Sequence, residues 1–82
     1  MSSLQYVIDS ICAKLTVESM YELIAVRLKQ GPFTVGEILP LIRCEDRSLD
    51  FSSAKMLAEA TLEALAQSGD IRIEGDCIYP VA

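Results

Sequence analysis

Several acidic side chains lie close enough together in the sequence to suggest acid–base or metal chemistry. They form the pairs Glu45–Asp46, Glu59–Glu63 and Glu74–Asp76, and Cys44 precedes the first pair. Such chemistry commonly uses histidine as base or ligand, and the chain contains none. The sequence also lacks an EF-hand spacing, a phosphate-binding loop and a nucleophile–base set. We therefore expect a solvated acidic surface, no enzymatic activity, no cofactor and no metal.

The cysteines and the distribution of apolar residues indicate in which cellular compartment the protein is expected to lie. Cys12, Cys44 and Cys77 are odd in number, far apart and without a CxxC spacing, which is typical of reduced, mostly buried thiols. No apolar run approaches the length of about 18 residues that spans a bilayer. The first ten residues have no basic segment before an apolar one, unlike a signal peptide. These features predict a cytoplasmic protein.

The overall composition predicts one small domain with apolar surface to cover. The 82 residues correspond to a single domain (residues 1–82) near the lower size limit for an independent core. Hydrophobic residues make up 51% of the chain, and its mean hydropathy is +0.33. Because so small a domain exposes most of its surface, we expect either unusually efficient packing or an apolar face that a partner covers. A second copy of the chain is the simplest partner.

The segment from Ser52 to Tyr79 gives the clearest structural signal, a helix followed by a hairpin. Apolar residues recur at helical spacing up to Gly69, a natural residue to close a helix. Asp50, Ser52 and Ser53 are alternative N-caps. Ile71 to Glu74 alternates in polarity, Gly75-Asp76 forms a turn of type II′ or with a small bulge, and the returning strand ends at Pro80.

Two helices are predicted before this segment. An apolar stripe indicates a helix over residues 4–15, with Ser2 or Ser3 as its cap. Thr16 is the expected break and the cap of a second helix over residues 17–30, which Gly31-Pro32 terminates. One continuous helix through Thr16 is the alternative.

A third, short helix is predicted to begin at Val35. Thr34 and Glu37 have the spacing of a capping box, and Phe33 and Ile38 have that of a hydrophobic staple. Pro40 lies too far inside for the first turn, so we expect the helix to kink or end near residues 39–42. Residues 43–50 are then an exposed polar loop.

The order of these elements resembles that of the winged-helix superfamily. The resemblance rests on GPFTVGEILPLI as the second helix and on LEALAQSGDIRIEGDCIYPV as the end of the third helix running into the wing. It implies an α+β, mostly helical fold, with a three-helix core and C-terminal β-hairpin wing over residues 17–80 and an additional N-terminal helix over residues 1–15. Pro40 and the long loop over residues 43–51 depart from the family pattern.

Winged-helix domains most often bind DNA through the third helix and the wing. The expected outward face of the third helix consists of Ser52, Lys55, Met56, Glu59, Glu63 and Gln67. At the wing, Arg72 is offset by Glu74 and Asp76, and the net charge of the chain is −5. DNA-binding proteins usually make several contacts from Lys and Arg to phosphates. The candidate nucleic-acid contacts are Arg43, Arg47, Lys55 and Arg72.

The N-terminal stripe has two interpretations. It packs on the core of its own chain, or it forms an interface with a second copy or a partner helix. The candidate interface residues are Leu4, Tyr6, Val7, Ile8, Ile11, Leu15, Met20 and Tyr21.

Three functions follow from these patterns. The apolar excess and the acidic charge favour a small non-enzymatic regulatory module that acts through protein–protein contacts, possibly as a homodimer, and does not bind a membrane. The alternative is a winged-helix DNA-binding transcription regulator. A third is an acidic decoy for a nucleic-acid-binding protein, presenting Glu59, Glu63, Glu74 and Asp76.

Overall fold

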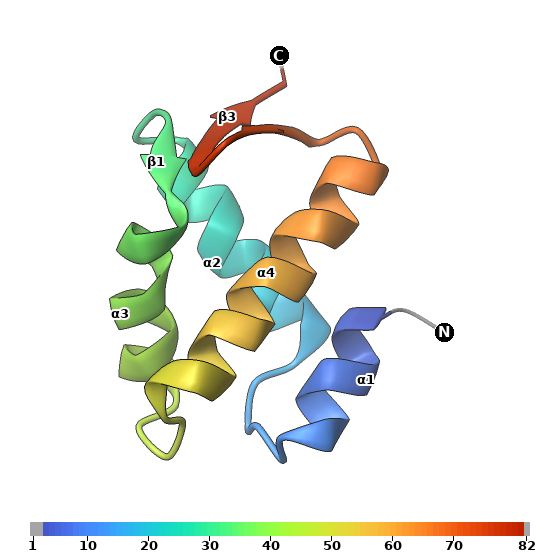
Figure 1. Cartoon of the computed structure of the whole chain (residues 1–82), viewed down its shortest axis with the longest axis vertical. Helices are drawn as coiled ribbons and strands as arrows, with labels where there is room; N and C mark the ends of the chain where they lie inside the picture. Colours follow the sequence, from blue (N-terminus) through green and yellow to red (C-terminus); the bar gives the residue numbers. More distant parts are fainter. Residues whose placement is uncertain (1–2, 82) are drawn as a thin grey trace.

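The computed structural model describes residues 3–81 and shows an α+β, mostly helical fold, as predicted. Four helices surround a common core, and a small antiparallel sheet closes one end of it (Figure 1). The elements in chain order are α1 (Ser3–Ser10), α2 (Val17–Leu28), β1 (Phe33–Thr34), α3 (Val35–Glu45), α4 (Phe51–Gln67), β2 (Ile71–Glu74) and β3 (Cys77–Pro80).

The first helix is shorter than predicted, because the chain turns at Cys12. This residue has a φ of 56°. The N–H of Ala13 donates to the carbonyl of Ile8 (3.1 Å), and that of Cys12 donates to Asp9 (3.4 Å), which is the Schellman pattern of a helix end. The predicted extent to residue 15 was therefore wrong, and so was the alternative of one continuous helix. Ser2 lies outside the described residues.

Thr16 begins α2 as predicted. Its Oγ1 accepts a hydrogen bond from the N–H of Ser19 (3.0 Å), which satisfies one of the unpaired amides of the first turn. The helix ends at Leu28, two residues earlier than expected, and Gly31 follows with a φ of 113°.

The third helix has the predicted start and a different end. Its capping box is present, and the Glu37 carboxylate accepts from the N–H of Thr34 (2.7 Å). The helix continues through Pro40 to Glu45, so of the two expected alternatives, a kink or an end near residues 39–42, the end was wrong. Proline deprives only the carbonyl of Gly36 of its helical partner, and Gly36 is exposed, so water can replace that bond. The connecting loop is consequently shorter than expected, spanning residues 46–50.

The fourth helix and the hairpin follow the prediction closely. Asp50 is the N-cap, and its Oδ1 accepts from the N–H of Ser53 (2.8 Å). A Schellman pattern ends α4, in which Gly69 has a φ of 85° and the N–H of Asp70 donates to Leu65 (3.0 Å). In the two-residue turn between β2 and β3 only Gly75 has a positive φ, 61°, which fits the type II′ alternative.

The sheet contains a third strand that was not predicted. The two residues of β1 pair with β3, so the strand order is β1-β3-β2, with Phe33 opposite Ile78. Phe33, Ile71 and Ile78 are buried against the helices. A segment of two residues has no measurable periodicity, so only its tertiary partner identifies it as a strand.

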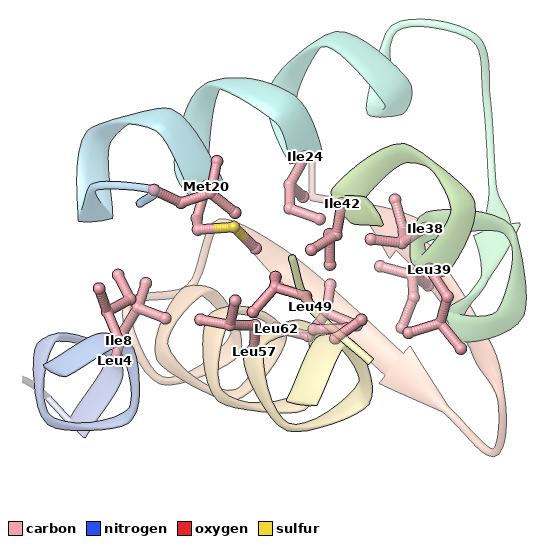
Figure 2. Packing of buried hydrophobic residues seen from close by; sticks show 14 of the residues in the cluster. Leu4, Ile8, Met20, Ile24, Ile38, Leu39, Ile42, Leu49, Leu57 and Leu62 are labelled. Carbon is pink, nitrogen blue, oxygen red and sulfur yellow. The ribbon is translucent and has the colours of Figure 1, made fainter. Parts of the chain in front are cut away.

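One hydrophobic cluster joins all the elements. Figure 2 shows Met20 and Ile24 of α2 directed towards Leu57 and Leu62 of α4, while the buried side chains of α3 close the cluster from the other side. The first helix packs mainly on α4, where Leu4 and Ile8 are buried.

A buried carboxylate links the N-terminal segment to the loop between α3 and α4. Asp46 accepts hydrogen bonds from the backbone N–H of Lys14 (2.9 Å) and of Ser48 (3.0 Å). The bond from Lys14, and to a smaller degree the bonds from Ser48, lower the pKa of Asp46. This side chain had been predicted to lie in an exposed polar loop; it is buried where the loop contacts the segment between α1 and α2 that contains Lys14.

Over the described range, residues 3–81, none of the helices combines the length and the apolar character needed to cross a membrane. The thiols of Cys12 and Cys44 are exposed and that of Cys77 is half-buried, so the prediction of mostly buried cysteines was wrong.

Candidate functional site

The surface of the helical core is hollowed between α2 and α3. Five of its lining residues belong to α2 and are three or four positions apart, which places them on one face of that helix, and Gln30 follows the end of the helix. Four residues of α3 with the same spacing form the other side. The groove has a volume of about 850 Å³ and is lined by Ser19, Glu22, Leu23, Val26, Arg27, Gln30, Glu37, Leu41, Cys44 and Glu45.

The middle of the groove is apolar and accessible. Val26 and Leu41 are 52% and 40% exposed, and the half-buried Leu23 lies on the same face of α2 as Val26. Large apolar side chains exposed next to one another in a concave surface are more typical of a binding site than apolar residues scattered singly.

An ion pair between two lining residues lies towards one end of the groove. Arg27 of α2 lies 3.2 Å from the Glu37 carboxylate of α3, and its guanidinium lies 5.2 Å from the centre of the Phe33 ring. The N–H of Thr34, followed by Arg27, lowers the pKa of Glu37, because both interactions stabilise the charged carboxylate. The Arg27 guanidinium therefore interacts with Glu37 and Phe33 of its own chain.

The other end of the groove is acidic. Glu22 on α2 and Glu45 on α3 are both exposed, and neither forms an ion pair with any residue in the described part of the chain. The groove thus combines an apolar floor with uncompensated negative charge. Such a surface suits an apolar segment flanked by basic side chains.

The predicted interface residues occupy different places in the structure. Leu4, Ile8, Leu15 and Met20 are buried in the core, so their assignment to an interface was wrong. The reason is that α1 packs on α4, which is the other interpretation of the stripe. Val7, Ile11 and Tyr21 are half-buried against the same core, and Tyr6 alone among the eight candidates is largely exposed.

Three of the four predicted nucleic-acid contacts flank or belong to the loop between α3 and α4. Arg43 is in the last turn of α3, Arg47 in the following loop and Lys55 near the start of α4, and all are exposed. The N–H of Ser53, and more weakly the charge of Arg43, lower the pKa of Asp50 at the N-terminus of α4.

The fourth predicted contact, Arg72, belongs to the hairpin, which lies at the opposite end of the molecule from the loop between α3 and α4 (Figure 1). Its side chain pairs with Glu74 (3.0 Å) and lies 5.1 Å from the centre of the Tyr79 ring. The structure therefore does not bring it to the other three.

The acidic pairs considered in the sequence analysis lie on separate elements of the fold. Glu59 and Glu63 lie on the exposed face of α4, as expected, while Glu74 is engaged by Arg72. Within residues 3–81, no three cysteine, aspartate or glutamate side chains are grouped in a way that would hold a metal ion.

Sequence reasoning missed the groove. Val26 and Leu41 lie beside the apolar stripes of their helices, so counting apolar residues includes them in the overall excess without showing where they meet. Comparison of the chain with protein-family models, curated proteins and solved structures gave no match.

Proposed function

We propose that this protein is a cytoplasmic, non-enzymatic regulatory module of the winged-helix type that acts by binding a protein chain in the groove between α2 and α3. The observation that carries the proposal is the apolar floor of Val26 and Leu41 beside the unpaired carboxylates of Glu22 and Glu45. Three helices closed by a hairpin support the winged-helix assignment. The free thiols support the compartment.

Binding at this groove has a clear physical basis. Contact removes the exposed apolar side chains from water, which is worth about 25 cal/mol per Å² of apolar surface. The acidic end adds selectivity, because opposite charges attract a basic partner and repel an acidic one. The groove is formed by two helices of the packed core, so little ordering of the backbone is required on binding.

Site-specific photo-crosslinking in cells tests the proposal. A photoreactive amino acid replaces Gln30 at the rim of the groove, and in a matched control it replaces Gln67, an exposed glutamine at the end of α4. We expect a protein adduct from position 30 only, and we expect Val26→Lys to abolish it, because lysine removes the apolar contact and repels a basic partner. Equal adducts at both positions, or adducts that survive Val26→Lys, would contradict the proposal.

The exposed Arg43, Arg47 and Lys55, which lie in or beside the loop between α3 and α4, favour DNA binding as a second candidate function. Its test is the fluorescence anisotropy of a labelled random duplex at about 50 mM salt, where counterion release favours binding. A rise that fades with added salt and is reduced by Arg47→Glu supports this function. A flat titration eliminates non-specific DNA binding as the role of these three residues.

A further inference from the structure

The small sheet has a free edge at β2. Among the strands of residues 3–81, β2 pairs only with β3, and the strand order β1-β3-β2 places it at the edge. Three consecutive residues of β2 are exposed, namely Arg72, Ile73 and Glu74, and the apolar Ile73 is 41% exposed. The other edge strand, β1, has only two residues. Because an edge strand presents unpaired backbone groups, β2 offers a template for a further strand.

The register of the hairpin determines which backbone groups of β2 point outward. The residues that flank a two-residue turn, here Glu74 and Cys77, form a hydrogen-bonded pair, and hydrogen-bonded and non-hydrogen-bonded pairs then alternate along the strands. Ile73, opposite Ile78, therefore belongs to a non-hydrogen-bonded pair. Its N–H and C=O point away from β3 towards the free edge, where water or a further strand must satisfy them.

β2 lacks several features that commonly prevent an edge strand from pairing. Edges are often protected by lysine, proline or a bulge. The strand contains neither lysine nor proline, and its register with β3 is regular over all four residues. It does carry two charged residues, Arg72 and Glu74, which lie on the same face because they are two positions apart. Their charges are opposite, so they attract a copy of the strand that runs in the opposite direction.

We propose that β2 pairs antiparallel with β2 of a second copy of this chain, about a two-fold axis beside Ile73. In this register Ile73 lies opposite Ile73 of the second copy, and the two residues exchange both of their outward backbone hydrogen bonds. The two exposed isoleucines cover each other on one face of the joined sheet. On the other face Arg72 of each copy lies opposite Glu74 of the other, which gives two cross-strand pairs of opposite charge.

The charges favour this register over its neighbour. An axis beside Arg72 also joins outward-facing backbone groups, but it places the two Arg72 side chains opposite each other and Glu74 opposite Asp70. Like charges at directly opposite positions destabilise a strand pair. In the proposed register, Asp70 and Asp76 are opposite each other only beyond the ends of β2. A foreign strand would need an acidic and a basic residue at the same spacing, which β2 of a second copy already has.

The proposed contact goes beyond the proposed function, because no residue of β2 lines the groove between α2 and α3. It is isologous: the same strand of each copy contributes the same residues, so the pair closes and does not continue into a filament. The contact is short, and we therefore expect the pair to form only at high protein concentration.

The test exchanges charges in the full-length chain. Arg72→Glu places two carboxylates opposite each other at both cross-strand positions, and Glu74→Arg places two guanidinium groups there. Each variant is expected to raise the dissociation constant of self-association at least about tenfold, since two attractive pairs become repulsive. An equimolar mixture of the two variants is expected to restore association, because one supplies two acidic and the other two basic side chains at the facing positions.

Matched controls make the same changes of charge away from the hairpin. Arg47→Glu lies in the loop between α3 and α4, and Glu59→Arg lies on the exposed face of α4. Both are expected to associate like the native chain, alone and when mixed. The hairpin variants are expected to fold, because the side chains of Arg72 and Glu74 are 64% and 58% exposed, and circular dichroism verifies this.

Self-association is measured by light scattering after size exclusion at up to about 1 mM protein. The mass of the native chain is expected to rise from the 9.0 kDa of one copy towards twice that value. Amide hydrogen exchange of the native chain supplies a second measurement, which does not depend on any variant. Exchange at Ile73 is expected to slow as the concentration rises, because its outward N–H becomes hydrogen-bonded in the pair.

Four results overturn the inference. They are a native chain that stays at the mass of one copy, association that both hairpin variants leave unchanged, a mixture that associates no better than its components, and exchange at Ile73 that does not depend on concentration. The second result would assign the contact to another surface. None of these results affects the crosslink from position 30, which tests the proposed function separately.

Discussion

Truncating Ile8 distinguishes a structural role of the N-terminal helix from an interface role. The side chain is 4% exposed and belongs to the core cluster through which α1 packs on α4. Ile8→Ala removes buried methyl and methylene groups and leaves a cavity. Because this is how a core residue behaves, we expect the substitution to lower the free energy of unfolding.

The magnitude follows from the position of the side chain. Replacing a buried isoleucine by alanine costs about 2–5 kcal/mol. The first helix packs on the edge of the core, where neighbouring groups can partly relax, so we expect about 2–3 kcal/mol, within the range for such truncations. For a domain of this size, that corresponds to a fall in Tm of about 10–20 °C. Urea and thermal unfolding followed by far-UV circular dichroism measure both quantities.

Tyr6→Ala on the same helix is the matched control. Tyr6 is 68% exposed, so its removal is expected to change stability by less than about 0.5 kcal/mol, although it deletes a larger side chain. Both variants are measured at two protein concentrations, which reveals any coupling to self-association. A normal Tm for Ile8→Ala together with weakened self-association would refute the structural role and restore the interface interpretation.

Three further predictions concern backbone conformation and pH. Cys12→Gly is expected to raise the free energy of unfolding by about 0.5–1 kcal/mol, as measured by urea unfolding, because it relieves a positive φ at a residue with a side chain. Gly69→Ala is expected to lower the free energy of unfolding by about 1 kcal/mol, because it puts a side chain on a residue with a positive φ. Gly36→Ala lies inside α3, where the nearest atom is 4.0 Å from the new Cβ, and is expected to raise the free energy of unfolding by about 0.5–1 kcal/mol. The same sign for both substitutions would contradict this reasoning. The folded pKa of Asp46 lies below its unfolded value, so its charge stabilises the fold above the unfolded pKa, and this contribution is lost as the pH falls through the folded pKa. Asp46→Asn is therefore expected to lower the Tm at neutral pH and to flatten its decline below about pH 4, and an unchanged acid profile would show that another group is responsible.

Local signals predicted much of the secondary structure. Thr16, Thr34 with Glu37, and Asp50 cap their helices because their side chains satisfy backbone amides within three residues. The end of α4 and the turn of the hairpin were predictable for a similar reason, since Gly69 and Gly75 reach a positive φ without steric cost. Where the local signal was weaker, the boundaries were wrong: Cys12 adopts a conformation that its type disfavours, and α3 continues through Pro40.

The candidate site was not predictable in the same way. The apolar excess indicated that some apolar surface remains uncovered, and the structure places part of it at Val26 and Leu41 between α2 and α3. The N-terminal apolar stripe, which had been the candidate interface, packs instead against the core of its own chain. Its periodicity is the same in both cases, because an apolar helix face does not specify which surface covers it.

The sequence by itself therefore determined the helices, their caps, the hairpin and the acidic charge, since each depends on interactions between near neighbours or on composition alone. Only the tertiary structure decided that α1 packs on α4 and that β1 pairs with β3. It also decided that the Asp46 carboxylate is buried and accepts a hydrogen bond from the N–H of Lys14. It also decided which apolar residues remain exposed as a groove. These features depend on contacts between residues distant in the chain, where many pairings satisfy the same local pattern and the packing of the whole core selects one of them.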